Sequence, residues 1–175
     1  KLLEKRLFPV GKFIPLGNST VGSSIEFNNK KYLIESLENF DPQTAQIIIF
    51  SAGSTVAEKY ARDFVAAGSF VVDLSSNFRY QDDVPLIIPE INGDIIESLS
   101  KPSLIANPNC STAQLLMALK PIHDNAKIKF LNIATYQAVS GTGKAALEEL
   151  HNQTYFTDSE NESVVYPKQI AFNVI

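Results

Sequence analysis

Cysteine, methionine, histidine and tryptophan are scarce in this sequence. Its 175 residues include one Cys, one Met, two His and no Trp. One cysteine cannot form an internal disulfide, so we expect the reducing environment of the cytoplasm. One cysteine and two scattered histidines make no cluster of metal ligands, and we expect no metal. No apolar run approaches the roughly 20 residues that a membrane-spanning helix needs, which argues against a membrane protein.

Positive charge is in short supply as well. Lysine and arginine number 15 against 19 aspartate and glutamate residues, for a net charge of −4. Nucleic acids and anionic membranes bind basic patches, so neither is an expected partner. Hydrophobic residues at 45% and charged residues at 19% are typical of an ordinary globular protein. A chain of this length can bury one good core, or form one domain and part of another.

The glycine-rich turn G-x-G-x-x-G of dinucleotide-binding folds is also absent. Leu2, Leu3 and Leu7 share one face of a predicted helix that Pro9 stops. We therefore expect that the chain begins inside a helix, and that the first strand of the fold and its phosphate-binding turn precede Lys1.

What the sequence does contain is a regular alternation of strand and helix signals. A helix is predicted after Ser54 or Thr55, either of which can cap it, and Gly68 closes it. Asn28-Asn29-Lys30 is a hairpin signal between two of the strands. Strand, helix and strand at this spacing predict an α/β fold, a Rossmann-like parallel sheet covered by helices. The predicted strands are residues 12–16, 25–27, 31–34, 46–50, 70–74 and 104–106.

Polar segments follow three of these strands. Ligands of open parallel sheets bind past the carboxyl ends of the strands. The sequence therefore predicts one crevice that is lined by Ser51-Ala52-Gly53, Ser75-Ser76 and Asn107-Pro108.

The only cysteine, Cys110, follows the last of these polar segments. Pro108 disfavours helix before it, and Ser111 or Thr112 can cap a helix that runs to Leu119. Unpaired N–H groups and the helix dipole at such a position favour a thiolate, which is a nucleophile. A lone cysteine is about as often a small buried core residue. The polar loop around the thiol favours a catalytic role for Cys110 over a structural one.

The alternation of short buried strands and helices ends at the cysteine, where we place a domain boundary. Residues 1–109 form the predicted dinucleotide-binding domain, and residues 110–175 begin an α+β catalytic or dimerisation domain. Residues 127–136 alternate in character, which predicts a long half-buried strand of a mixed or antiparallel sheet. Gly141-Thr142-Gly143 opens a further helix, residues 157–163 form an acidic loop, and residues 170–175 are apolar.

Two motifs resemble the aspartate-semialdehyde dehydrogenase family closely. They are Asn107-Pro108-Asn109-Cys110-Ser111-Thr112 and Thr135-Tyr136-Gln137-Ala138-Val139-Ser140-Gly141-Thr142-Gly143, and they stand at the family's spacing. Segments 51–53, 73–79, 84–86 and 89–92 fall in the family's order. The two motifs are specific, since other enzymes with a cysteine thioester, such as glyceraldehyde-3-phosphate dehydrogenase, carry different residues around the thiol.

The resemblance implies an enzyme that reduces aspartyl phosphate to aspartate semialdehyde through a cysteine thioester. Its cofactor would be NADP(H), its partners a small-molecule substrate and phosphate, its pathway the synthesis of lysine, threonine and methionine, and its assembly a homodimer or homotetramer. Cys110 would be the nucleophile, and Gln137 would orient the acyl group. The substrate and phosphate site would comprise Arg79, Asn109, Ser140 and Gly141. The cofactor site would comprise Ser19, Thr20, Ser51, Ala52, Gly53, Ser75, Asn107 and Pro108.

Plainer interpretations of these residues stay open at this point. Gln137 can make a structural hydrogen bond at a strand end, and Arg79 can be a surface residue paired with Asp82 or Asp83. A related enzyme such as N-acetyl-glutamyl-phosphate reductase, or a non-catalytic dinucleotide-binding fragment, is an alternative function. Three further polar residues are expected to be solvated rather than catalytic: His123, Lys144 and His151.

Two departures from the family bear on these expectations. The family's catalytic histidine and its substrate-carboxylate arginine would lie beyond Ile175, so we expect the 175 residues alone to be inactive. The loop Asn18-Ser19-Thr20 carries no cation for the 2′-phosphate of NADP. The preference for NADP is therefore weakened, and NAD stays possible.

Overall fold

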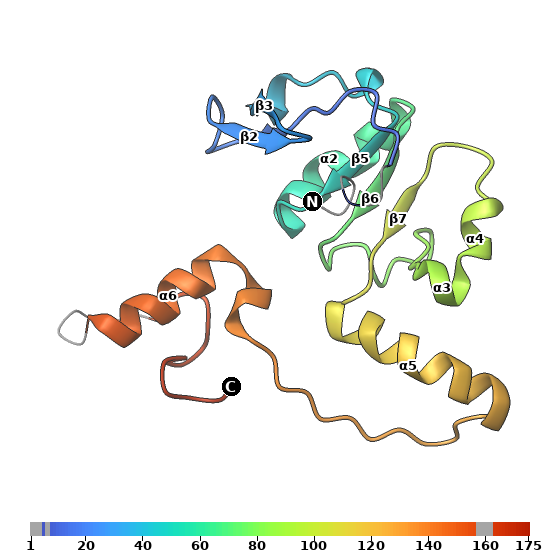
Figure 1. Ribbon diagram of the computed structural model, residues 1–175, viewed down its shortest axis with the longest axis vertical. Helices are drawn as coiled ribbons and strands as arrows, with labels where there is room; N and C mark the ends of the chain where they lie inside the picture. The colour runs from blue at the N-terminus through green and yellow to red at the C-terminus, as the bar shows by residue number, and fades with distance from the viewer. Residues whose placement is uncertain (1–4, 6–7, 157–162) are drawn as a thin grey trace. The chain divides into compact units, whose positions relative to one another are not determined.

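The chain folds into two units, Lys1–Lys127 and Ile128–Ile175. The computed structural model describes residue 5, residues 8–156 and residues 163–175 (Figure 1). The helix predicted around Leu2, Leu3 and Leu7 and most of the predicted acidic loop lie outside these residues. Within the described part of the chain, no helix has the length and apolar character to cross a membrane.

A three-stranded parallel sheet organises the first unit. Strands β5 (Ile47–Phe50), β6 (Phe70–Asp73) and β7 (Leu104–Ala106) lie side by side in that order (Figure 1). A parallel bridge from Leu86 to Ala106 adds one more residue pair beyond β7. The predicted parallel α/β sheet is confirmed.

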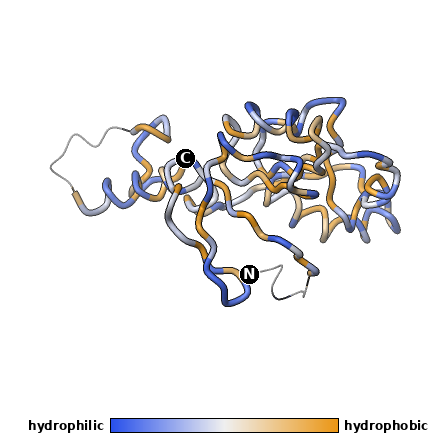
Figure 2. Tube along the Cα trace, turned by 90° about the horizontal axis from the view of Figure 1, so that it is seen from above, coloured by the Kyte–Doolittle hydropathy of each residue, from blue (hydrophilic) through white to orange (hydrophobic). Residues whose placement is uncertain are grey.

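Helix α2 (Ser54–Ala66) covers one face of this sheet. Alternate residues of β5 point to opposite faces, so Ile48 and Phe50 are buried whereas Ile47 and Ile49 are each 53% exposed. Figure 2 shows apolar stretches through the middle of this unit and polar stretches at its outer turns. The core joins strand and helix residues, among them Ile48, Phe50, Ala57, Ala61, Phe64, Val71, Leu104 and Ala106.

Glycines set both ends of α2. Gly53 precedes the helix with φ 89°, and neither Ser54 nor Thr55 caps it as predicted, because Ser54 is already the first helical residue. Gly68 ends it with φ 107°, as predicted. Its N–H donates to the Val65 carbonyl at 3.0 Å, and the next N–H donates to the Phe64 carbonyl at 3.1 Å. This pair of bonds is the Schellman motif, which needs a left-handed residue.

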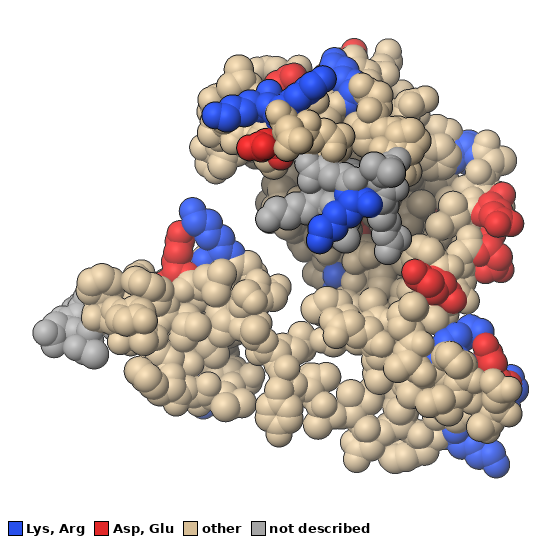
Figure 3. Space-filling view, in the orientation of Figure 1, with Lys and Arg blue, Asp and Glu red and all other residues tan. Residues whose placement is uncertain are grey.

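The predicted hairpin is confirmed. Strands β2 (Ser24–Phe27) and β3 (Lys30–Leu33) pair in antiparallel register. Asn28 and Asn29 between them have φ of 50° and 59°, which is the left-handed conformation that a two-residue hairpin turn requires. Phe13 stacks on Phe27 with ring centroids 4.4 Å apart. In Figure 3, basic side chains stand close to acidic ones over this hairpin.

The strand predicted at residues 12–16 is shorter and later than expected. Strand β1 (Leu16–Gly17) pairs in parallel with β4 (Glu35–Ser36), and residues 12–15 pair with no strand among the described residues. A strand is defined by its ladder partner, and β4 is only two residues long. Short helical turns complete the unit: η1 (Leu37–Asn39), η2 (Pro42–Thr44), α3 (Pro89–Asn92) and α4 (Asp94–Glu97).

Helix α5 (Cys110–Ala126) runs well past the predicted end at Leu119. Pro121 lies inside it, although a proline in a helix interior removes one backbone hydrogen bond and disfavours helix. An ion pair from Lys120 to Asp124 at 2.5 Å spans the proline. The unit boundary after Lys127 therefore places α5 with the sheet, whereas the predicted domain boundary precedes Cys110.

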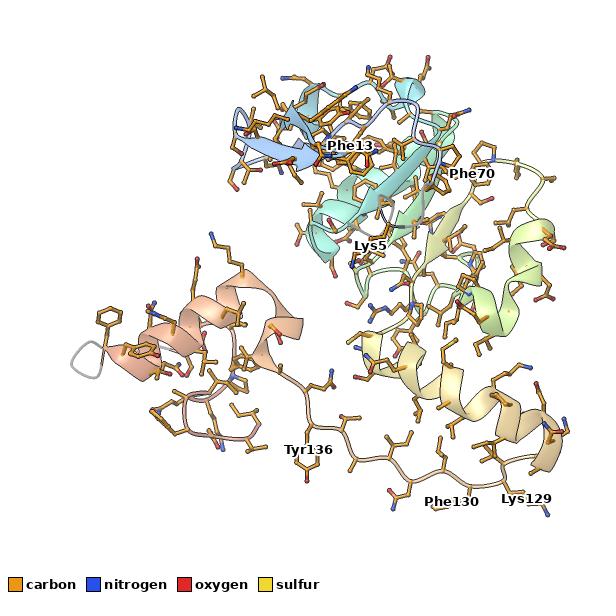
Figure 4. All side chains as sticks on the ribbon, viewed as in Figure 1. Lys5, Phe13, Phe70, Lys129, Phe130 and Tyr136 are labelled. Atoms are coloured by element: carbon orange, nitrogen blue, oxygen red, sulfur yellow. The ribbon has the colours of Figure 1, made fainter. Side chains whose placement is uncertain are left out.

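The second unit holds η3 (Val139–Thr142) and α6 (Lys144–Tyr155). The long strand predicted at residues 127–136 is not formed, which corrects that prediction. The stretch is free of regular structure because no other described strand pairs with it, and an alternating pattern needs such a ladder. Phe130 and Tyr136 are 84% and 94% exposed, and both project from this stretch in Figure 4.

Candidate active site

The carboxyl ends of β5, β6 and β7 form one edge, and most of the predicted cofactor residues lie along it. Ser51, Ala52 and Gly53 follow β5, Ser75 follows β6, and Asn107 and Pro108 follow β7. The hydroxyls of Ser54 and Ser76 are 3.4 Å apart, which joins the start of α2 to the loop after β6. The Asn107 N–H donates to the Asp73 carbonyl at 2.8 Å, which joins that loop to the end of β7.

Asp73 shapes the loop after β6, a role that sequence reasoning missed. Its side chain is fully buried and accepts the Ser75 N–H at 3.1 Å and the Ser75 hydroxyl at 2.7 Å. The Ser75 hydroxyl in turn accepts the Asn77 N–H at 3.1 Å. An Asp followed by a Ser two residues later is a known signal for such a turn, so the sequence did contain it.

Arg79 lies against the same edge. Its Nε donates to the Asn107 carbonyl at 2.9 Å, and its Nη2 donates to the Leu74 carbonyl at 3.3 Å. Both acceptors are neutral, so these contacts leave the guanidinium charge uncompensated, and Nη1 takes part in neither bond. Asp83 pairs instead with Arg62 at 2.8 Å, which lowers the pKa of Asp83. Among the described residues Arg79 forms no ion pair with Asp82 or Asp83, so its interpretation as a surface partner of either one is wrong.

Cys110 is the first residue of α5, and its thiol is free and exposed. Asn109 caps the helix, because its side-chain oxygen accepts the Ser111 N–H at 2.9 Å. The predicted caps Ser111 and Thr112 are therefore wrong, although Asn ranks beside Ser among capping residues. By the geometry of a helix start, the N–H groups of Cys110 and Thr112 have no intrahelical partner. The thiol therefore lies exposed at a helix terminus, and it is not a buried core residue.

Exposure of this thiol predicts fast alkylation of the folded protein. A limiting amount of iodoacetamide is expected to modify Cys110 before denaturation, because the side chain is exposed and lies at a helix N-terminus. Mass spectrometry of the intact protein measures the modification. A thiol that reacts only after denaturation contradicts the assignment of Cys110 as the nucleophile.

The remaining predicted residues of the substrate site lie in the second unit. Gln137 belongs to the stretch before η3, and its side-chain oxygen accepts the Thr135 hydroxyl at 3.5 Å. Ser140 and Gly141 lie within η3. Gln137 and Cys110 therefore belong to different units. Gly143 joins η3 to α6 with φ 113°, a conformation that favours glycine.

Other polar residues behave as solvated side chains. Lys144 is exposed and pairs with Glu148 at 3.3 Å, one turn along α6. His123 lies exposed in the last turn of α5, and His151 packs against the Tyr155 ring at 4.7 Å. No group of three metal-ligating side chains occurs among the described residues.

Ser19 and Thr20 lie in the turn after β1, which belongs to a separate two-stranded sheet with β4 rather than to the three-stranded sheet. Both are exposed, and the Thr20 carbonyl accepts the N–H and the hydroxyl of Ser23 at 3.1 and 2.6 Å. The turn is therefore held by its backbone, which leaves the Ser19 side chain at the surface.

A parallel sheet with polar loops at its carboxyl edge, followed by a helix that begins at an exposed cysteine, is the architecture of a dinucleotide-binding α/β domain. The family model described as semialdehyde dehydrogenase, NAD binding domain, matches residues 1–99. The model of that family's dimerisation domain matches residues 119–175. The chain belongs to the semialdehyde dehydrogenase family.

Individual relatives agree with this assignment. An aspartate-semialdehyde dehydrogenase of Shewanella violacea is 49% identical over all of this chain and 53% of its own length. One of Legionella pneumophila is 44% identical over 99% of this chain and 51% of its own. A crystal structure of aspartate semialdehyde dehydrogenase II from Vibrio cholerae, complexed with ASA, is 40% identical and superposes with a TM-score of 0.89, covering 98% of this chain and 52% of that one. The chain thus spans about half the length of the curated relatives it matches.

Proposed function

We propose that the protein is an aspartate-semialdehyde dehydrogenase, which reduces aspartyl phosphate to aspartate semialdehyde and releases phosphate. The observation that carries the proposal is the exposed thiol of Cys110 at the first position of α5, with Arg79 bound to the carbonyl of Asn107. Relatives of that name at 44–49% identity support it. In this role the protein serves the synthesis of lysine, threonine and methionine, and it dimerises through its second domain.

The side chains have distinct tasks in this reaction. The Cys110 thiolate attacks the carbonyl carbon of the acyl phosphate, and phosphate leaves as the thioester forms. The guanidinium of Arg79, helped by Asn109, holds the phosphoryl group that departs. Gln137, Ser140 and Gly141 orient the acyl group for the reduction that follows. The thiohemiacetal that results then collapses: its C–S bond breaks, the Cys110 sulfur leaves as thiolate, and the aldehyde is released.

The carboxyl edge of the sheet suits a bound nicotinamide dinucleotide, which supplies the hydride in this reaction. Gly53 has φ 89° at the start of α2, and a side chain added there would meet nothing within 4 Å. The space before the first turn of α2 is therefore open, and helix N-termini bind phosphate through their free N–H groups. Ser51 and Ala52 follow β5 just before this helix, and Ser75 follows the neighbouring strand β6. We therefore propose NADP(H) as the cofactor.

Phosphate dependence tests the proposed function. The full-length protein is expected to reduce NADP⁺ with aspartate semialdehyde only when inorganic phosphate is present, because phosphate must cleave the thioester. Absorbance at the nicotinamide band measures the rate. The same assay with N-acetylglutamate semialdehyde is the control. A faster rate with that substrate, or a rate without phosphate, contradicts the proposal.

The exposed turn after β1 predicts that kcat/KM for NADP exceeds that for NAD only slightly. Ser19 and Thr20 can bond a 2′-phosphate only through neutral donors, and hydrogen bonds between charged groups are about twice as strong. The variant Ser19→Arg should therefore raise the ratio of kcat/KM for NADP to that for NAD by about tenfold, equal to about 1.4 kcal/mol. Val21→Arg, at an exposed position of the same turn, is the matched control. Strong NADP selectivity in the unmodified protein would show that a cation reaches the 2′-phosphate from another segment.

A further inference from the structure

A buried carboxylate on α6 organises the second unit. Glu149 is 8% exposed, and its Oε2 accepts the N–H groups of Val165 at 2.6 Å and Val164 at 3.0 Å. Its Oε1 accepts the N–H of Tyr166 and the side-chain amide of Gln153, each at 3.4 Å. The bond from Val165 contributes most to a lowered pKa of Glu149, although burial acts in the opposite direction. The charged carboxylate therefore gathers three consecutive N–H groups.

Gln153, one helical turn after Glu149, binds further backbone N–H groups of the same C-terminal segment in the same way. Its side-chain oxygen accepts the N–H groups of Ile170 at 2.9 Å and Ala171 at 3.1 Å. Residues four apart on a helix lie on the same face, so Glu149 and Gln153 act side by side. Ile170 and Ala171 are buried. The backbone of residues 164–171 is therefore fixed to α6 by two side chains rather than by a strand ladder.

The anchored segment reaches the loop that carries Ser140 and Gly141. The hydroxyls of Tyr166 and Thr142 lie 2.8 Å apart, and Thr142 is the last residue of η3. The backbone bonds of η3 are local: Gly141 N–H to the Ala138 carbonyl at 3.1 Å is one of them. The contact between Thr142 and Tyr166 instead spans 24 positions of the sequence.

We propose that Tyr166, anchored through its backbone by Glu149, is a positioning residue for the substrate loop Val139–Thr142. The inference rests on the proposed function, because it takes Ser140 and Gly141 as residues that contact the substrate or phosphate. Small displacements of such a loop weaken substrate binding and slow the reaction. Tyr166 acts through Thr142 and does not touch the substrate, so its loss should raise KM more than it lowers kcat.

A double-mutant cycle on the two hydroxyls tests the proposal in the full-length enzyme. Tyr166→Phe and Thr142→Val each remove one hydroxyl, and each should raise KM for phosphate and for aspartate semialdehyde by about three- to tenfold, the worth of one hydrogen bond. The double variant should be no worse than either single one, since both remove the same contact. Thr142→Ser keeps the hydroxyl and should retain the wild-type KM.

The anchor is tested on α6 itself. Glu149→Gln removes the charge that gathers the N–H groups, so KM should rise as in Tyr166→Phe. Glu148→Gln makes the same change at the neighbouring exposed position and should leave KM unchanged. If Glu149→Gln does not fold, the variants Tyr166→Phe and Thr142→Val still test the proposal. Wild-type KM in the hydroxyl variants, or additive effects in the double variant, overturns the positioning role while the proposed function stands. An unmodified enzyme that is inactive with aspartate semialdehyde overturns both.

Discussion

Replacement of Cys110 by serine is expected to lower kcat for aspartate semialdehyde oxidation by about 10⁴-fold or more. The thiol is exposed at the first position of α5, where it can reach a carbonyl carbon, and the neighbouring hydroxyls lack its nucleophilicity at neutral pH. Serine retains the shape of the side chain with one atom changed. Steady-state rates of the full-length protein, measured at saturating phosphate and cofactor, give the ratio.

The stability of the variant separates lost chemistry from lost structure. A substitution at an exposed position usually changes the free energy of unfolding by less than about 0.5 kcal/mol. Asn109 caps α5 in both proteins, because the capping bond goes to the Ser111 N–H. The thermal midpoint of Cys110→Ser should therefore match that of the wild type. A kcat within tenfold of the wild-type value would mean that another group forms the covalent intermediate.

The parallel sheet could be predicted from the sequence because its signals are local. The apolar run of β5, the 3.6-residue period of α2 and the glycine at position 68 each act within a few residues. The hairpin turn at Asn28 and Asn29 is equally local. The length of the pairing between β1 and β4 could not be predicted. Each strand contributes only two residues, and the partner strand lies nearly 20 positions along the chain.

The prediction of a strand at residues 127–136 failed for the same reason. Alternation of apolar and polar residues describes how a strand would place its side chains, but the ladder needs a second strand. Among the described residues nothing pairs with this stretch, and Phe130 and Tyr136 stand out from it. The continuation of α5 through Pro121 was missed as well, because a proline inside a helix is locally unfavourable and its tolerance depends on the rest of the fold.

In the candidate site, too, the sequence predicted which residues matter but not which contacts they make. The motif around Cys110 identified the thiol, and the structure places it at a helix start as expected. The burial of Asp73, the choice of Asn109 over its neighbours as the capping residue and the partners of Arg79 emerged only from the fold, although the sequence did contain the Asp-x-Ser turn signal. These are contacts between segments or choices among adjacent polar residues. A sequence pattern names the candidates without ranking them.

The contacts of Arg79 lead to the second large expected effect. Arg79→Lys should raise KM for phosphate by about 10- to 100-fold while KM for NADP changes little, because a hydrogen bond to a charged group contributes about 1.5–3 kcal/mol. The guanidinium holds the carbonyls of Asn107 and Leu74 with two of its nitrogens. Lysine keeps the positive charge, but a single ammonium group cannot hold the loop and bind phosphate in a fixed plane.

Arg62→Lys is the matched control for this prediction. Arg62 lies on α2 and pairs with Asp83 and Gln81 at the surface, so the same replacement there should leave KM for phosphate unchanged. Initial rates over a range of phosphate and NADP concentrations separate the two KM values. An equal rise in both for Arg79→Lys would indicate that Arg79 only supports the loop between β6 and the end of β7. An unchanged KM for phosphate would remove Arg79 from the phosphate site, and the free N–H groups at the start of α5 would then be the remaining anion-binding groups beside Cys110.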